Sequence, residues 1–181
     1  MLQQTQVSRV EVFYPAFLKR FSSIEALARA RPKAVREAWE GLGYYARASH
    51  IHALARVVRR DFEGKLPENP EELERLPGVG RYTAGAIACF AYEKPVAAVD
   101  TNVARVIRRA FFGEGGRGKG EGSRQIWDKA AAIVPRNGKR AWKFNQAMME
   151  LGATVCMARK PKCPECPVRR DCKVGRRLGR G

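Results

Sequence analysis

Four cysteines near the C-terminal end of the sequence have the spacing of a metal-binding cluster. Cys156, Cys163, Cys166 and Cys172 follow the pattern C-x6-C-x2-C-x5-C. A structural zinc usually takes two close cysteine pairs or adds histidines, and only Cys163 and Cys166 form a close pair. Four cysteines without another ligand type also suit a [4Fe–4S] cluster. The chemistry of the spacing alone therefore leaves zinc and iron–sulfur open.

A glycine-rich turn, Leu76-Pro77-Gly78-Val79-Gly80, lies ahead of a segment of small residues. Two glycines spaced by one apolar residue let a second surface approach the backbone closely. Their amides point outward ahead of a helix N-terminus, which favours a phosphate ligand. The alternative is a tight turn between two helices.

A short apolar run, Val96-Ala97-Ala98-Val99, leads into Asp100 at the start of another helical segment. A carboxylate near an electropositive groove stabilises positive charge that develops in a reaction. A plain helix N-cap is the alternative, and both roles can coexist in one aspartate.

The elements around these residues are all helical by pattern. Apolar residues recur at helical spacing along the chain, and no alternating strand pattern of useful length is present. Ser22 and Glu25 resemble a capping box, and Asn69 followed by Pro70 predicts another helix start. Residues 113–122 contain six glycines and predict a flexible connection. We expect an all-α protein with one part at 1–117 and another at 118–181.

The composition points to a polyanionic partner. The chain of 181 residues has 35 Lys and Arg against 18 Asp and Glu, a net charge of +17, and nucleic acid is the first candidate. A basic surface that only aids solubility is the alternative. The sequence shows no membrane span or signal peptide, so we expect a cytoplasmic protein, associated with the nucleoid if bacterial or archaeal.

Together, the hairpin, Asp100 and the four cysteines resemble the helix-hairpin-helix DNA glycosylases with a C-terminal [4Fe–4S] cluster. The resemblance covers nearly the whole chain and favours iron–sulfur over zinc. It implies a six-helix barrel, with its hairpin at about 76–82, plus a cluster lobe. The MutY-type adenine DNA glycosylases are the most similar branch, through three motifs: Met1-Leu2-Gln3-Gln4-Thr5-Gln6-Val7, Gly41-Leu42-Gly43-Tyr44-Tyr45-Ala46-Arg47, and the segment that runs from Phe144 to Ala153.

The resemblance also implies roles for individual residues. Asp100 would stabilise an oxocarbenium ion, with Asn102 positioning it. Tyr82 occupies the position of a lysine in bifunctional relatives, and a tyrosine cannot form a Schiff base, which implies a monofunctional enzyme. The implied DNA contacts are Gln3, Gln4, Tyr44, Arg47, Gly78, Gly80 and Arg81, with a monovalent cation as a further ligand of the hairpin.

Two departures bear on the substrate. The family's catalytic glutamate would lie two residues before the motif at which this sequence begins. A general acid of this kind raises the reaction rate roughly 10²–10⁴-fold. Typical members continue into a domain that reads 8-oxoguanine, and we expect this chain to lack it. The motifs favour removal of adenine opposite guanine or 8-oxoguanine, whereas the departures favour thymine or uracil opposite guanine.

An alternative hypothesis is that the protein is not an enzyme but an iron–sulfur module that only binds DNA. The expected partner in every case is double-stranded DNA with a mispaired or damaged base, bound by a monomer without a membrane.

Overall fold

The computed structural model describes residues 1–113 and 124–177, and every regular element in this part of the chain is helical. The all-α prediction is therefore confirmed. In chain order the elements are α1 (Val7–Arg20), α2 (Ile24–Arg29), α3 (Pro32–Ala38), α4 (Ala46–Asp61), α5 (Pro70–Glu74), α6 (Arg81–Tyr92), α7 (Thr101–Ile107), the π-helical turn η1 (Arg108–Phe112), α8 (Arg124–Ile133), α9 (Gly138–Thr154), the 3₁₀ turn η2 (Cys163–Glu165) and α10 (Lys173–Arg177).

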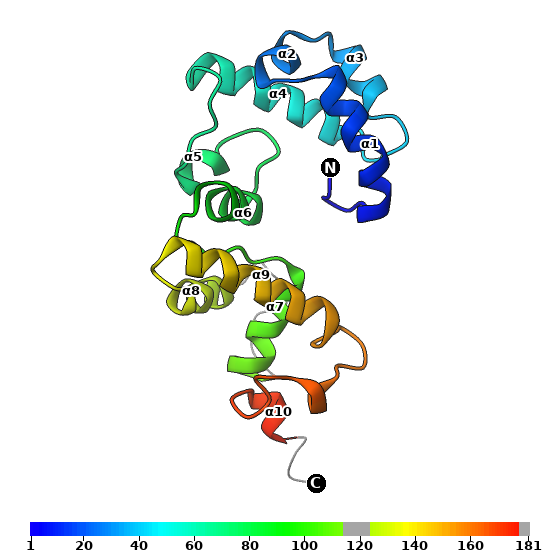
Figure 1. The fold of residues 1–181 in the computed structure, drawn as a ribbon. Helices are drawn as coiled ribbons and strands as arrows, with labels where there is room; N and C mark the ends of the chain where they lie inside the picture. The colour runs from blue at the N-terminus through cyan, green and yellow to red at the C-terminus, as the bar shows by residue number, and fades with distance from the viewer. Residues whose placement is uncertain (114–123, 178–181) are drawn as a thin grey trace. The chain divides into compact units, whose positions relative to one another are not determined.

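The chain divides into two compact units, Met1–Gly80 and Arg81–Gly181. In the described part of the second unit, helices from both sides of the glycine-rich segment pack together, because α7 contacts both α8 and α9 (Figure 1). The predicted boundary at 117–118 falls among residues 114–123, outside the described residues, and stays a prediction.

The first unit is built around α4, which packs along α2 and α3. Its core contains the aromatic rings of Phe17 and Trp39, whose centroids are 5.8 Å apart in an edge-to-face arrangement. Ser23 caps α2 by accepting a hydrogen bond from the amide of Ala26 at 3.0 Å. The predicted cap was Ser22, so the helix start was misplaced by one residue.

The glycine-rich turn follows α5, which begins as predicted with Asn69 accepting a hydrogen bond from the amide of Glu71. The amide of Val79 donates to the carbonyl oxygen of Leu76 at 3.1 Å and closes the turn. Gly78 has a φ of 75°, and a Cβ there would lie 2.6 Å from the Cβ of His50. Both the backbone conformation and the contact with α4 therefore require glycine at this position.

The second unit packs α6 and α7 on the long helix α9. Its apolar core combines Val99 with residues of α7 and with Ile126, Trp127 and Ala130 of α8. A Cβ at Gly85 of α6 would overlap the carbonyl oxygen of Ala97. The small residues of α6 thus let that helix approach the extended segment that leads to Asp100.

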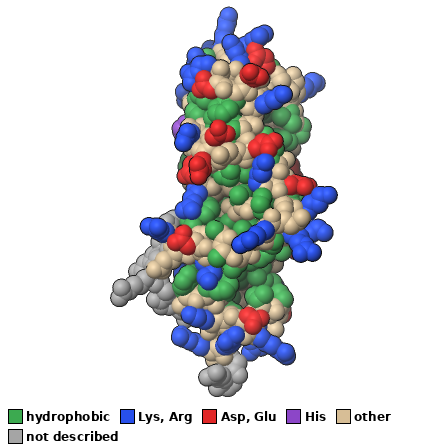
Figure 2. Space-filling model, turned by 90° about the vertical axis from the view of Figure 1, so that its left-hand side faces the viewer, with side chains coloured by type: hydrophobic (Ala, Val, Ile, Leu, Met, Phe, Trp, Pro, Cys, Tyr) green, Lys and Arg blue, Asp and Glu red, His purple; other side chains and the backbone are tan. Residues whose placement is uncertain are grey.

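Lys and Arg side chains project from many places on the face drawn in Figure 2, with fewer acidic side chains between them. None of the described helices is long and apolar enough to cross a membrane.

The close approach at Gly85 generates a stability prediction. We expect Gly85→Ala to lower the free energy of unfolding by about 1–3 kcal/mol, because the new methyl group displaces the Ala97 backbone. Gly80→Ala is the control, since a Cβ at Gly80 meets no atom within 4 Å. Thermal unfolding of both variants measures the difference, and equal stability would contradict the packing argument.

Candidate functional site

Asp100 is held by two hydrogen bonds at the start of α7. Its Oδ1 accepts from the amide of Val103 at 2.7 Å, and its Oδ2 accepts from Nδ2 of Asn102 at 3.1 Å. Asp100 is thus the N-cap of α7, and it remains half-buried rather than enclosed. Because both donors come from its own helix, the carboxylate has a fixed direction relative to α7.

Asn102 is itself held by an arginine that reaches α9. Arg105 donates from Nη2 to Oδ1 of Asn102 and to the carbonyl oxygen of Gly152, both at 2.7 Å. Its Nε donates to the carbonyl oxygen of Cys156 at 2.8 Å. Hydrogen bonds therefore run without interruption from the carboxylate of Asp100 to the backbone of the first cluster cysteine.

The segment before Asp100 is fixed by a buried amide that sequence reasoning did not single out. Asn145 of α9 is 2% exposed. Its Oδ1 accepts from the amide of Ala98 at 3.0 Å, and its Nδ2 donates to the carbonyl oxygens of Val96 and Ala141. A polar residue on the otherwise apolar, buried face of α9 was the available signal, because buried amides must find partners.

Tyr82 lies close enough to Asp100 to be affected by its charge. Burial raises the pKa of the Tyr82 phenol, and the negative charge of Asp100 raises it further. The side chain is still 38% exposed. The phenol therefore stays protonated at neutral pH and remains partly exposed.

Three of the predicted DNA contacts, Gly78, Gly80 and Arg81, lie in the glycine-rich turn and at the start of α6. Gly78 and Gly80 are both exposed, on either side of the buried Val79. The guanidinium carbon of Arg81, the first residue of α6, lies 4.1 Å from the ring centroid of Trp127. The stacked Arg81 side chain is thus held in place at the start of that helix.

Arg47 is engaged within the first unit. It donates to carbonyl oxygens of Met1, Gln3, Leu42 and Gly43 and to Oγ1 of Thr5. The same guanidinium lies over the rings of Trp39 and Tyr44. Arg47 therefore ties the first residues of the chain to the Gly-Leu-Gly-Tyr loop.

Gln4 and Tyr44, the two residues expected to enter a base stack, both have left-handed backbones, with φ values of 57° and 47°. Non-glycine residues in this region cost roughly 1–3 kcal/mol each and cluster at ligand sites. Tyr44 is 64% exposed. A pocket of about 420 Å³ lies between Gln4 and the Gly41-Leu42-Gly43 segment.

The four cysteines of the C-terminal motif line one small cavity with free thiols. Within the described residues, no three His, Cys, Asp or Glu side chains are grouped tightly enough to hold one metal ion. A single zinc needs all its sulfurs about 2.3 Å from one centre, whereas a polynuclear cluster spreads its thiolates around a larger core. Four thiols around one cavity, without a histidine, are the donor set that an iron–sulfur cluster takes.

Arg109 of η1 supports the cysteine loop. Its Nη1 donates to the carbonyl oxygen of Met157 at 2.7 Å and lies 3.5 Å from Sγ of Cys156. Burial and the three other thiols raise the pKa of Cys163, while the charge of Arg109 lowers it. The arginine thus favours the thiolate form that binds metal.

Two family models match this sequence, one over most of the chain and one over the cysteine motif. Residues 1–132 match the HhH-GPD superfamily of base excision DNA repair proteins. Residues 156–172 match the iron–sulfur binding domain of endonuclease III. The predicted iron–sulfur cofactor is thereby confirmed.

The matched relatives include adenine DNA glycosylases. That of Mycolicibacterium smegmatis is 45% identical over 93% of this chain and 56% of its own length. That of Rattus norvegicus is 41% identical over 100% of this chain and 35% of its own length. That of Homo sapiens is also 41% identical, over 98% of this chain and 32% of its own length. The chain therefore spans about a third to a little over half of these relatives.

Solved structures confirm the predicted helix-hairpin-helix glycosylase fold. A thermostable thymine-DNA glycosylase superposes with a TM-score of 0.87 at 32% identity, covering 97% of this chain and 80% of that one. Endonuclease III in a trapped covalent DNA intermediate gives a TM-score of 0.81 at 25% identity, covering 98% and 81%.

The role of Asn145 can be tested through stability. Asn145→Ala leaves the amide of Ala98 and the carbonyl of Val96 without their partners, and we expect a loss of about 1–3 kcal/mol. Lys143→Ala, at an exposed position of the same helix, should change stability by less than about 0.5 kcal/mol. Chemical denaturation distinguishes them, and equal midpoints would contradict the anchoring role.

The cysteine assignment predicts a selective loss of cofactor. We expect Cys163→Ser to reduce the iron content and the visible absorbance of the purified protein, because one of four ligands is lost. Cys89→Ala removes the buried cysteine that lies outside the cavity and should leave the iron content unchanged. Full iron loading of Cys163→Ser would show that the cluster does not use that thiol.

Proposed function

Because the chain belongs to the HhH-GPD superfamily of base excision DNA repair proteins, we propose that it is a monofunctional DNA glycosylase acting on mispaired adenine. The observation that carries the proposal is the carboxylate of Asp100, held by two hydrogen bonds, whose charge raises the pKa of the Tyr82 phenol. In this role the enzyme hydrolyses the N-glycosidic bond and leaves an abasic site.

Asp100 supplies the electrostatic part of the mechanism. As the glycosidic bond lengthens, positive charge develops on the deoxyribose, and a preorganised carboxylate stabilises that charge without reorienting. The hydrogen bonds from Val103 and Asn102 keep the carboxylate in one direction. Asn102 and Arg105 then act as positioning residues, because they reach the reacting sugar only through Asp100.

Tyr82 sets the outcome of the reaction. A lysine amine at this position would attack the sugar and form a Schiff base, which precedes strand cleavage. A phenol with a raised pKa is a poor nucleophile, so water completes the reaction and the strand stays intact.

Other residues of this chain are proposed to hold the DNA. The exposed backbone of Gly78 and Gly80 would bind a phosphate ahead of α6. A monovalent cation bound at the same hairpin is proposed from the family resemblance alone. Gln4 and Tyr44 would fill the space left by the extruded base, which offsets part of the unstacking cost. Their left-handed backbones and exposure support this role. Arg47 would act by holding the first residues of the chain and the Gly-Leu-Gly-Tyr loop together. Gln3 and Arg81 would contact DNA.

The preference for adenine rests on the relatives named adenine DNA glycosylase, at 41–45% identity. A second candidate is thymine opposite guanine, favoured by the superposition with a thymine-DNA glycosylase. We further propose that the protein acts as a monomer on double-stranded DNA in the cytoplasm.

The test is excision by the iron-loaded protein on end-labelled duplexes that contain A·8-oxoG, A·G, T·G, U·G or only matched pairs. We expect strand breaks only after hot alkali, on the adenine mispairs and not on the matched duplex. Breaks confined to T·G or U·G would select the second candidate. Breaks without alkali would contradict the role of Tyr82, and no breaks on any duplex would favour a non-catalytic DNA-binding module.

A further inference from the structure

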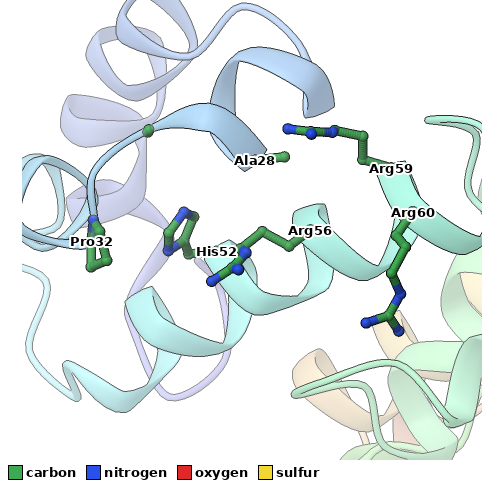
Figure 3. A pocket seen from close by; sticks show the side chains of 7 residues that line it. Ala28, Pro32, His52, Arg56, Arg59 and Arg60 are labelled. Carbon is green, nitrogen blue, oxygen red and sulfur yellow. The ribbon is translucent and has the colours of Figure 1, made fainter.

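The first unit contains a basic pocket that the proposed reaction does not use. It has a volume of about 440 Å³ and is lined by Ala28, Ala30, Pro32, His52, Arg56, Arg59 and Arg60. Figure 3 shows that His52, Arg56, Arg59 and Arg60 all extend from α4, with Arg59 directed toward Ala28 of α2 and His52 beside Pro32 of α3.

Helical spacing places the polar residues on one face of α4. Positions 52, 56 and 59 or 60 are three or four residues apart, so their side chains neighbour one another. Like charges at this spacing destabilise a helix. In Figure 3 the side chains of Arg56, Arg59 and Arg60 leave α4 in different directions, which separates their like charges.

Nearby acids compensate this charge only in part. Glu25 pairs with Arg29 at 2.7 Å and lies 3.7 Å from Arg59, while Asp61 pairs with Arg60 at 2.6 Å. Within the described residues, the side chain of Arg56 has no ion pair or hydrogen bond. Four arginines thus face two carboxylates, and Arg56 is the cation whose charge is uncompensated.

A buried group at the same pocket also lacks a partner. His52 is only 7% exposed, and its Nε2 has no hydrogen-bond partner among the described residues. Buried polar groups are nearly always paired with protein, water or ligand. A ligand with hydrogen-bonding oxygens, bound among the three arginines, would supply a partner for the Nε2 of His52.

We propose that this pocket binds a phosphate group, with Arg56 as its principal contact, Arg59 and Arg60 contributing charge, and His52 forming the inner wall. Arginine matches phosphate geometry through two parallel N–H donors. The group is either a backbone phosphate of DNA or a free phosphate, since both present the same oxygens. The proposal does not depend on the glycosylase activity.

The test measures binding of inorganic phosphate to the iron-loaded protein by calorimetry, in chloride buffer at constant ionic strength. We expect saturable binding that Arg56→Ala weakens about tenfold or more, the value of one charge-assisted hydrogen bond. Lys19→Ala, which removes one exposed charge from α1 of the same unit, should bind like the wild type. Absence of saturable binding, or equal loss in both variants, would overturn the proposal.

A second measurement identifies the source of the phosphate. Affinity for a fully matched duplex is measured across salt concentrations for the same two variants. If DNA supplies the group, Arg56→Ala reduces the salt slope by about one more than Lys19→Ala does. Equal slopes, together with lost phosphate binding, identify a free phosphate. Thermal unfolding checks that both variants fold.

Discussion

The buried side chain of Asn145 is the constraint on which the rest of the candidate site depends. Its amide holds both Val96 and Ala98 of the segment that leads to Asp100, from a helix that lies almost fifty residues later in the chain. An extended segment has no internal hydrogen bonds of its own, so its path is set by such external partners. The close approach of α6 at Gly85 fixes the same segment from another side.

The second unit joins the carboxylate and the cysteine loop in one polar network. Arg105 connects Asn102 with the backbone of Gly152 and Cys156, and Arg109 holds the residues that follow Cys156. A Cβ at Gly152 would lie 2.7 Å from the Cβ of Asn102, so glycine is needed where α9 meets the start of α7. Folding of the cysteine loop and orientation of Asp100 are therefore physically connected.

Local features were predictable from the sequence, and long-range ones were not. The Asn69 cap, the cap at Asp100 and the shared cavity of the four cysteines follow from short spacings. The partners of Asn145 and Arg105 lie up to 51 residues away, which no local pattern encodes. The resemblance implied that Arg47 contacts DNA, which stays a prediction. The sequence did not reveal that its guanidinium also binds carbonyl groups of the first residues of the chain, because those acceptors lie far from it in the sequence.

In the proposed mechanism the charge of Asp100 stabilises the developing positive charge on the sugar, in addition to capping α7. The most direct measurement compares wild type with Asp100→Ser in thermal unfolding and in single-turnover base excision. Serine also caps helices well but carries no charge. We expect the serine variant to keep nearly unchanged stability and DNA affinity and to lose excision. Retained excision by the serine variant would contradict this mechanism and reduce Asp100 to a structural cap.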